Sequence, residues 1–146
     1  MQTQKERGFT LVELVVVLAV LGIVAAVAVP KYVSHVKEAR VAALNGLAGA
    51  IRSAVLLVHS KYMAAATGTS PVTLLDTTTV AVTTGASGGM PLAATGGIDH
   101  ALKFDGFAYT DNADQTAAFD FETPVTNCKL TYTEATGLVT LTSSGC

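Results

Sequence analysis

The chain has 146 residues, of which half are hydrophobic and only 14% are charged, and its mean hydropathy is positive. This length holds one domain plus an appended element. The formal net charge of −2 is too small to indicate nucleic-acid binding, and the sequence contains no basic stripe with interleaved aromatic residues.

The apolar residues are concentrated near the N-terminus. A polar and charged stretch, residues 1–8, precedes an apolar run, residues 9–29, that contains a single charge at Glu13. A helix crosses a bilayer with roughly 20 apolar residues at 1.5 Å rise per residue. The run therefore predicts a helix long enough to span a membrane.

Two ordinary explanations of this segment fit it poorly. A secretory signal peptide has an apolar core of about 7–15 residues before a small-residue cleavage site, and Ala26-Val27-Ala28 matches such a site. However, the run is longer, contains Glu13 and is closely followed by Pro30. A plain membrane anchor has no need of a carboxylate, which costs about 2.5–3.5 kcal/mol at the centre of a span and less near its end.

A third explanation gives Glu13 a partner. Cleavage after Gly8 exposes a new α-amino group on Phe9, one helical turn before Glu13. A carboxylate in the first turn complements the helix dipole. Within one subunit the amine of Phe9 and the carboxylate of Glu13 can pair. Between subunits, a buried carboxylate is neutralised by a neighbour's amine, an attraction that is strong in a low dielectric. Such a pair would set the stagger between neighbouring helices.

The stretch Arg7-Gly8-Phe9-Thr10-Leu11-Val12-Glu13-Leu14 closely resembles the prepilin processing motif of type IV pilins and of type II secretion pseudopilins. The resemblance implies that a prepilin peptidase cuts between Gly8 and Phe9 and that Phe9 is then N-methylated. It also implies that Glu13 takes part in subunit docking.

Further positions match the same family. Gly22 and Pro30 correspond to its helix-loosening glycine and proline. The short leader and Phe9 are similar to the type IVa branch rather than to the longer-leadered IVb branch. Residues 34–62 are most similar to pilins of the mannose-sensitive haemagglutinin type.

The basic residues that flank the run do not decide its orientation. Two of them precede it and three follow it, namely Lys5 and Arg7 against Lys31, Lys37 and Arg40. Long following domains cross a membrane largely regardless of such charges, and a cysteine pair favours an oxidising compartment. We therefore expect the C-terminal part to lie outside the inner membrane.

A second helical segment follows the apolar run. Pro30 lacks an N–H and clashes with the preceding turn, so it is expected to break or kink a helix. Beyond it, residues 31–66 predict a helix with a core-facing stripe of Leu44, Leu47, Ile51, Val55, Val58 and Tyr62. A helix over residues 9–63 measures roughly 80 Å, against a width of about 26 Å for a 100-residue domain. Its apolar half is therefore expected to protrude into a membrane or a bundle of copies.

From Thr67 onward the sequence is rich in threonine, alanine, glycine and short β-like runs. Glycine and proline predict a loop at residues 85–97. The expected strands are residues 72–75, 79–83, 102–109, 117–122, 127–133 and 138–142. The last two are expected to form a hairpin around residues 134–137.

The two cysteines, Cys128 and Cys146, allow two separate thiols or one disulfide. Behind a membrane-targeting segment, a disulfide in an oxidising compartment is favoured. Strand alternation places Cys128, Leu130 and Tyr132 on the core face, so a bond would hold Cys146 back on the sheet. It would stabilise the fold by about 3 kcal/mol.

Other polar residues do not form a convincing site. His35, His59 and His100 are expected to have surface or packing roles. Residues 111–115 fail the EF-hand calcium spacing, because Ala113 stands where an oxygen ligand is required. The sequence has no recognisable catalytic triad, phosphate-binding loop or Cys/His metal spacing. We therefore predict no enzymatic activity, no metal and no cofactor.

These features predict an α+β fold, in which a long N-terminal helix packs by its amphipathic half on a C-terminal antiparallel sheet, as in pilins. The expected segments are a leader at residues 1–8, a transmembrane or filament-core helix at 9–29, an amphipathic helix at 30–66 and a disulfide-closed β domain at 67–146.

The expected function is that of a major pilin, anchored in the inner membrane as a precursor and then assembled into an extracellular type IV pilus for adhesion. Its implied partners are copies of itself, the prepilin peptidase/methyltransferase and the pilus assembly machinery, with no nucleic acid. A type II secretion pseudopilin is the alternative, although such proteins commonly rely on calcium rather than a cysteine pair. A membrane-anchored enzyme or binding protein would need a polar cluster that the sequence does not offer.

Overall fold

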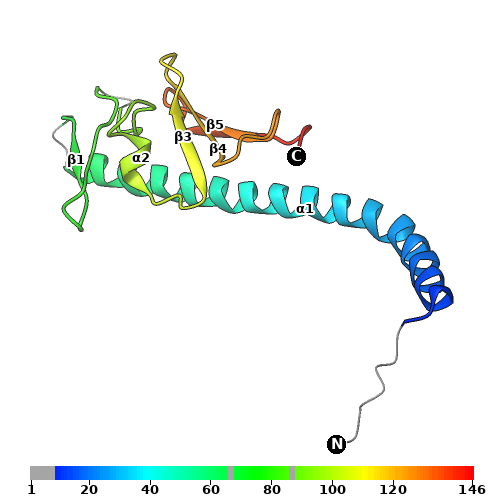
Figure 1. The fold of residues 1–146 in the computed structure, drawn as a ribbon. Helices are drawn as coiled ribbons and strands as arrows, with labels where there is room; N and C mark the ends of the chain where they lie inside the picture. The colour runs from blue at the N-terminus through cyan, green and yellow to red at the C-terminus, as the bar shows by residue number, and fades with distance from the viewer. Residues whose placement is uncertain (1–8, 66–67, 86–87) are drawn as a thin grey trace, which may run out of the picture. The chain divides into compact units, whose positions relative to one another are not determined.

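The computed structural model describes residues 9–65, 68–85 and 88–146. Its elements are α1 (Leu11–Ala65), β1 (Val72–Thr73), β2 (Thr79–Val80), α2 (Ile98–Ala101), β3 (Phe107–Asp111), β4 (Thr116–Phe121), β5 (Lys129–Thr133) and β6 (Leu138–Thr142). A long N-terminal helix followed by an antiparallel sheet confirms the predicted α+β fold (Figure 1). The predicted leader, with Gly8, lies outside the described residues, as do residues 66 and 67 at the predicted helix–domain boundary.

The helix α1 is continuous over 55 residues. It runs through Gly22 and Pro30 without interruption, so a break at Pro30 does not occur. A proline removes one backbone hydrogen bond, a cost that does not end the helix here, although valine is frequent on both sides of Pro30. The described helix extends to Ala65, and the predicted end at residue 66 lies outside the described residues.

The chain divides into two compact units, residues 1–37 and 38–146. In the first unit, the described side chains from Phe9 to His35 are exposed. The second unit contains the rest of α1 and all the strands.

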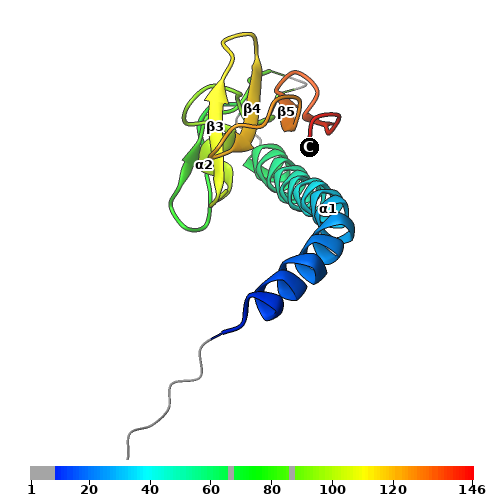
Figure 2. The same cartoon turned by 45° about the vertical axis from the view of Figure 1, so that its right-hand side comes forward.

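The main sheet has the strand order β3-β4-β5-β6, and each strand pairs antiparallel with the next along the chain. Its register aligns one row of side chains across all four strands, Tyr109, Phe119, Leu130 and Leu141. Figures 1 and 2 show this sheet lying along the C-terminal half of α1, within the second unit. A separate two-stranded sheet pairs β1 with β2.

The core forms between α1 and these two sheets. All six residues of the predicted stripe on α1 are at most 6% exposed. Leu44, Leu47, Ile51 and Val55 pack with sheet residues that include Phe119, Leu130 and Tyr132. The two C-terminal members of the stripe pack instead with the β1–β2 side, against Val72, Val80 and Val82. The amphipathic half of α1 therefore packs as its periodicity predicts.

The predicted strands differ from the observed ones mainly before β4. The strands predicted at residues 72–75 and 79–83 are observed as the two-residue strands β1 and β2. The backbone N–H groups of Leu74 and Thr77 form hydrogen bonds within the turn that joins these two strands. Residues 81–83 bond to residues 90–96 instead, so the predicted loop at 85–97 is partly paired.

The predicted strand over residues 102–109 begins only at Phe107. The short helix α2 precedes it, and the Phe107 N–H donates to the Phe104 carbonyl at 3.0 Å. Gly106 has a φ of +85° in this turn, a conformation that glycine adopts readily. The ends of β4 and β5 lie within about two residues of the predicted ends. The bounds of β6 and the β5–β6 hairpin agree with the prediction.

Truncation of the core stripe is expected to unfold the second unit more easily. We expect Ile51→Ala to lower the free energy of unfolding by about 2–5 kcal/mol, because this side chain is fully buried between helix and sheet. Leu57→Ala removes a similar volume from the same helix at a position that is 60% exposed, so its effect should stay within about 1 kcal/mol. Denaturant unfolding of both variants, followed by circular dichroism, measures the difference, and equal losses would contradict the assignment of the core stripe.

Two tyrosines hold the segment that leads into α2 on the main sheet. The Tyr132 hydroxyl donates to the Pro91 carbonyl at 2.7 Å, and the Tyr109 hydroxyl donates to the Ala93 carbonyl. The Ala93 N–H donates in turn to the Glu134 carboxylate at 2.7 Å. Burial, supported by the charge of Glu134, raises the pKa of Tyr132.

These hydroxyl donors predict a loss of stability at alkaline pH. Burial, with Asp99, Asp111 and Glu134 nearby, raises the pKa of Tyr109 to about 12, against about 10 in an unfolded chain. The contribution is complete below about pH 10 and is lost as the pH rises from about 10 to about 12. Unfolding free energies measured across this window should fall more steeply for the wild type than for Tyr109→Phe. Parallel curves would contradict a contribution from Tyr109.

Candidate functional site at the start of α1

Thr10 and Glu13 form reciprocal hydrogen bonds around the first turn of α1. The Thr10 N–H donates to Glu13 Oε2 at 2.9 Å, and the Thr10 hydroxyl donates to the same oxygen at 2.8 Å. The Glu13 N–H donates to Thr10 Oγ1 at 3.3 Å. This arrangement is a capping box, which satisfies donors that the start of a helix otherwise leaves unpaired.

The capping role of Thr10 was missed by reasoning that considered only the charge of Glu13. The signal is present in the sequence, because Thr10-Leu11-Val12-Glu13 has the spacing of a threonine followed three residues later by a glutamate before an apolar run. Both bonds from Thr10 use Oε2 of the carboxylate. Within the part of the chain that the structure describes, Thr10 therefore leaves the second carboxylate oxygen of Glu13 for another donor.

The helix surface that follows Glu13 is apolar and exposed. Between Phe9 and Val29, fourteen large apolar side chains are each at least 50% exposed. Burying one such side chain is worth about 1.5–3 kcal/mol, so a water-exposed surface of this size is strongly unfavourable. By length and composition α1 qualifies as a membrane-spanning helix. Burial of this surface in a membrane or against the helices of other copies would remove that cost.

Gly22 lies in the middle of this exposed surface. A Cβ placed there would meet no described atom within 4 Å, so a neighbouring helix could approach the backbone closely. The helix-loosening roles of Gly22 and Pro30 remain predictions, because α1 is helical at both positions.

Cys128 and Cys146 are joined in a disulfide with a Cα–Cα distance of 4.8 Å, so the predicted bond is present. Cys128 is fully buried with Leu130 and Tyr132, as the alternation predicts. The Arg40 guanidinium donates to the Cys146 carbonyl oxygen at 3.2 Å. The C-terminal segment is therefore held to β5 by the disulfide and to α1 by Arg40.

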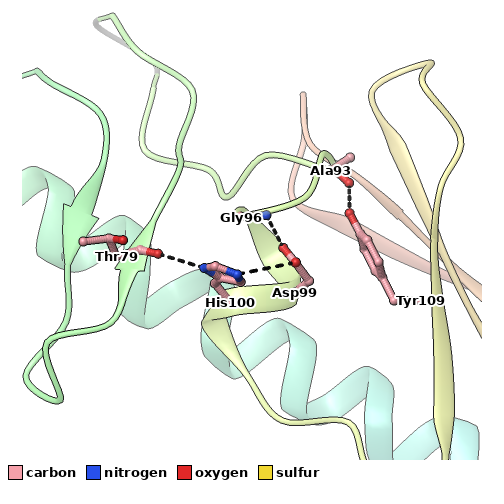
Figure 3. A network of polar contacts seen from close by, with 6 residues as sticks. All are labelled: Thr79, Ala93, Gly96, Asp99, His100 and Tyr109. Atoms are coloured by element: carbon pink, nitrogen blue, oxygen red, sulfur yellow. Dashed lines mark hydrogen bonds and ion pairs between the residues drawn. The ribbon is translucent and has the colours of Figure 1, made fainter.

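The histidines do not gather into a site. His100 Nδ1 lies 3.3 Å from the Thr79 carbonyl oxygen, and its Nε2 lies 3.9 Å from an Asp99 carboxylate oxygen (Figure 3). The other carboxylate oxygen of Asp99 accepts the Gly96 N–H at 2.8 Å. These contacts connect α2 to β2. His59 belongs to α1 and has a buried Nδ1 that packs against Gly89.

The acidic residues of the β3–β4 turn are used within the turn. Asp111 accepts the Ala113 N–H at 2.8 Å, and Asp114 accepts the N–H and hydroxyl of Thr116. Among the described residues, no group of three or more His, Cys, Asp or Glu side chains is placed to hold a metal ion. A surface hollow is lined by Asp99, Lys103, Asp105 and Glu122, and its lining contains no histidine and no cysteine.

Comparison with known proteins supports the assignment of the N-terminal segment. A family model described as the prokaryotic N-terminal methylation motif matches residues 3–29. No curated protein and no solved structure matches the chain. The match covers the Gly8–Phe9 junction, the capping box and the apolar run, and it supports a type IV pilin-like or pseudopilin-like precursor. Proteins with this motif are structural, processed by a prepilin peptidase and handled by pilus-type assembly machinery.

Proposed function

We propose that this chain is the major pilin of a type IV pilus. A prepilin peptidase would cut it between Gly8 and Phe9 and methylate the new amine of Phe9, and copies would then assemble through residues 9–29. The observation that carries the proposal is the exposed apolar surface of α1, which starts at a single carboxylate inside a matched methylation motif.

The capping box supports a two-stage role for Glu13. In a membrane-anchored precursor, the two donors from Thr10 offset part of the cost of keeping a carboxylate in the bilayer. In a filament, the α-amine of a neighbour's Phe9 would bind the remaining carboxylate oxygen. A charge pair in this low-dielectric setting is strong when formed and costly when one member is missing. Assembly would thus favour the one stagger that brings amine and carboxylate together.

A pilin is favoured over a type II secretion pseudopilin by the Cys128–Cys146 bond, because major pseudopilins commonly rely on calcium instead. The β domain would coat the outside of the filament, where it could serve surface attachment, as in pilins of the mannose-sensitive haemagglutinin type. The precursor would wait in the inner membrane and the filament would be extracellular.

Intact-mass measurement of the mature protein tests the proposal. The expected mass lacks Met1–Gly8, includes one added methyl group and lacks two hydrogens because of the disulfide. A chain that keeps its leader would overturn the proposal. Electron microscopy of sheared surface material then separates the two filament classes, because long extracellular fibres indicate a pilin and their absence favours a pseudopilin.

A further inference from the structure

Basic and aromatic side chains follow the apolar run on α1. Lys31, Tyr32 and Lys37 are exposed, and Tyr32 is 71% exposed. All three belong to the first compact unit. Basic residues are usually more frequent on the cytoplasmic side of a membrane span, whereas Lys31 and Lys37 follow the span on the side expected to lie outside. Filament formation through residues 9–29 gives these side chains no role.

The spacing along the helix places Lys31 and Tyr32 in the headgroup region and Lys37 just beyond it, where its side chain can reach back toward the headgroups. Residues 9–29 rise over about 30 Å, which matches the hydrocarbon thickness of a bilayer. Lys31 then lies about 3 Å beyond the hydrocarbon boundary and Lys37 about 12 Å beyond it. The headgroup region of each leaflet is roughly 5–8 Å thick. Lysine stems extend toward headgroups, and tyrosine rings favour this interface.

Lys31 and Lys37 also lie on different sides of the helix. At 3.6 residues per turn, Tyr32 lies about 100° and Lys37 about 240° around α1 from Lys31, so the three side chains are spread around the helix instead of forming one face. Lipid headgroups surround a spanning helix on all sides, whereas a single protein partner contacts one side. The distribution of charge therefore fits lipid better than a second protein.

We propose that Lys31, Tyr32 and Lys37 form a collar that binds anionic phospholipid headgroups in the outer leaflet of the inner membrane. The collar fixes the depth of the precursor, with Glu13 near the opposite boundary, until assembly removes the helix from the bilayer. This inference rests on the membrane stage of the proposed function.

Lipid selectivity of the full-length protein in nanodiscs tests the collar. With one chain per disc of equimolar phosphatidylglycerol and phosphatidylcholine, spin-labelled lipid of each kind reports its association with the protein. We expect a preference for phosphatidylglycerol of roughly fivefold for each lysine, reduced at high salt. Lys31→Gln/Lys37→Gln should remove the part of the preference that these two lysines supply, while Lys5 and Arg7, which precede the span in the sequence, are the same in every protein compared. Lys103→Gln/Lys129→Gln removes the same charge from the second unit and should leave the preference unchanged.

A wild type without the preference, or a Lys31→Gln/Lys37→Gln variant whose preference equals that of the wild type, would overturn the collar. If the variant keeps the lipid preference and forms fewer filaments, the lysines contact a second copy of the chain instead. Alkaline carbonate extraction of the same preparations separates this inference from the proposed function. A chain that is extracted from the membrane contradicts both, whereas an embedded chain without lipid preference contradicts only the collar.

Discussion

Cells that express Glu13→Ala are expected to lack filaments while the protein remains inserted in the membrane. The substitution removes the only carboxylate between Phe9 and Val29 and, in the proposed filament, would leave the α-amine of each neighbour's Phe9 unpaired in an apolar surrounding. Breaking a buried charge pair by removing one partner costs about 3–5 kcal/mol. A loss of that size at every subunit contact is enough to prevent elongation. Sheared filament yield and membrane fractionation, measured on the same cells, check both parts of the expectation.

Because Glu13 also caps α1, the charge and the cap must be separated. Glu13→Gln keeps an oxygen that can accept the Thr10 N–H, and glutamine serves in capping boxes, but the variant has no charge for a neighbour's amine. Thr10→Val removes the capping hydroxyl and keeps the charge. We expect Glu13→Gln to lose filaments as Glu13→Ala does, and Thr10→Val to keep them, since loss of a cap costs only about 0.5–2 kcal/mol. Normal filaments from Glu13→Gln would contradict a role for the charge and leave only the cap.

The helical half of the fold was predictable because its signals are local and repeated. The stripe from Leu44 to Tyr62 has six apolar members at helical spacing, and all of them are buried. The strand β6 was also predictable, since Leu138–Thr142 follows a turn containing Gly137 that has a φ of +67° and leaves the hairpin few alternatives. Each of these elements is specified by neighbouring residues.

The elements that were missed depend on contacts between distant segments. Residues 81–83 have a β-like composition, yet they bond to residues 90–96, a partner that no local pattern identifies. The four residues of α2 are too few to show a helical period. At Pro30 the predicted break does not occur, because one missing backbone hydrogen bond is not enough to end a helix of 55 residues.

At the candidate site, the residue types were predictable and their geometry was not. The motif identifies Phe9 and Glu13 from sequence alone, and the structure adds that Glu13 is already bonded to Thr10 within the same chain. From charge alone, the predicted partner of the carboxylate is the α-amine of Phe9, in the same subunit or in a neighbour. In the described residues only one oxygen of the carboxylate is hydrogen-bonded, so the proposed docking would complete the bonding of Glu13 instead of providing all of it.

Loss of the Cys128–Cys146 disulfide is expected to destabilise the second unit by about 3 kcal/mol. The bond joins residues 18 apart, and the chain-entropy model gives about 3 kcal/mol for a loop of this size. Cys146→Ser is the cleaner variant, because Cys146 is partly exposed while Cys128 fills part of the core. Thermal unfolding of the full-length protein in detergent should show a melting temperature lower by roughly 10–20 °C. Wild-type protein treated with a reductant should melt at the same temperature as the variant.

A second variant distinguishes the covalent bond from the packing of its sulfur. Cys128→Ala removes the same disulfide and also a fully buried side chain, so it should be less stable than Cys146→Ser by about 1 kcal/mol for the space left in the core. The contact from Arg40 to the Cys146 carbonyl persists in both variants only if the C-terminus stays in place. Arg40→Gln should therefore cost little while the disulfide is intact. A melting temperature for Cys146→Ser within a few degrees of the wild type would mean that Arg40 and the β5–β6 pairing hold the C-terminus without the bond.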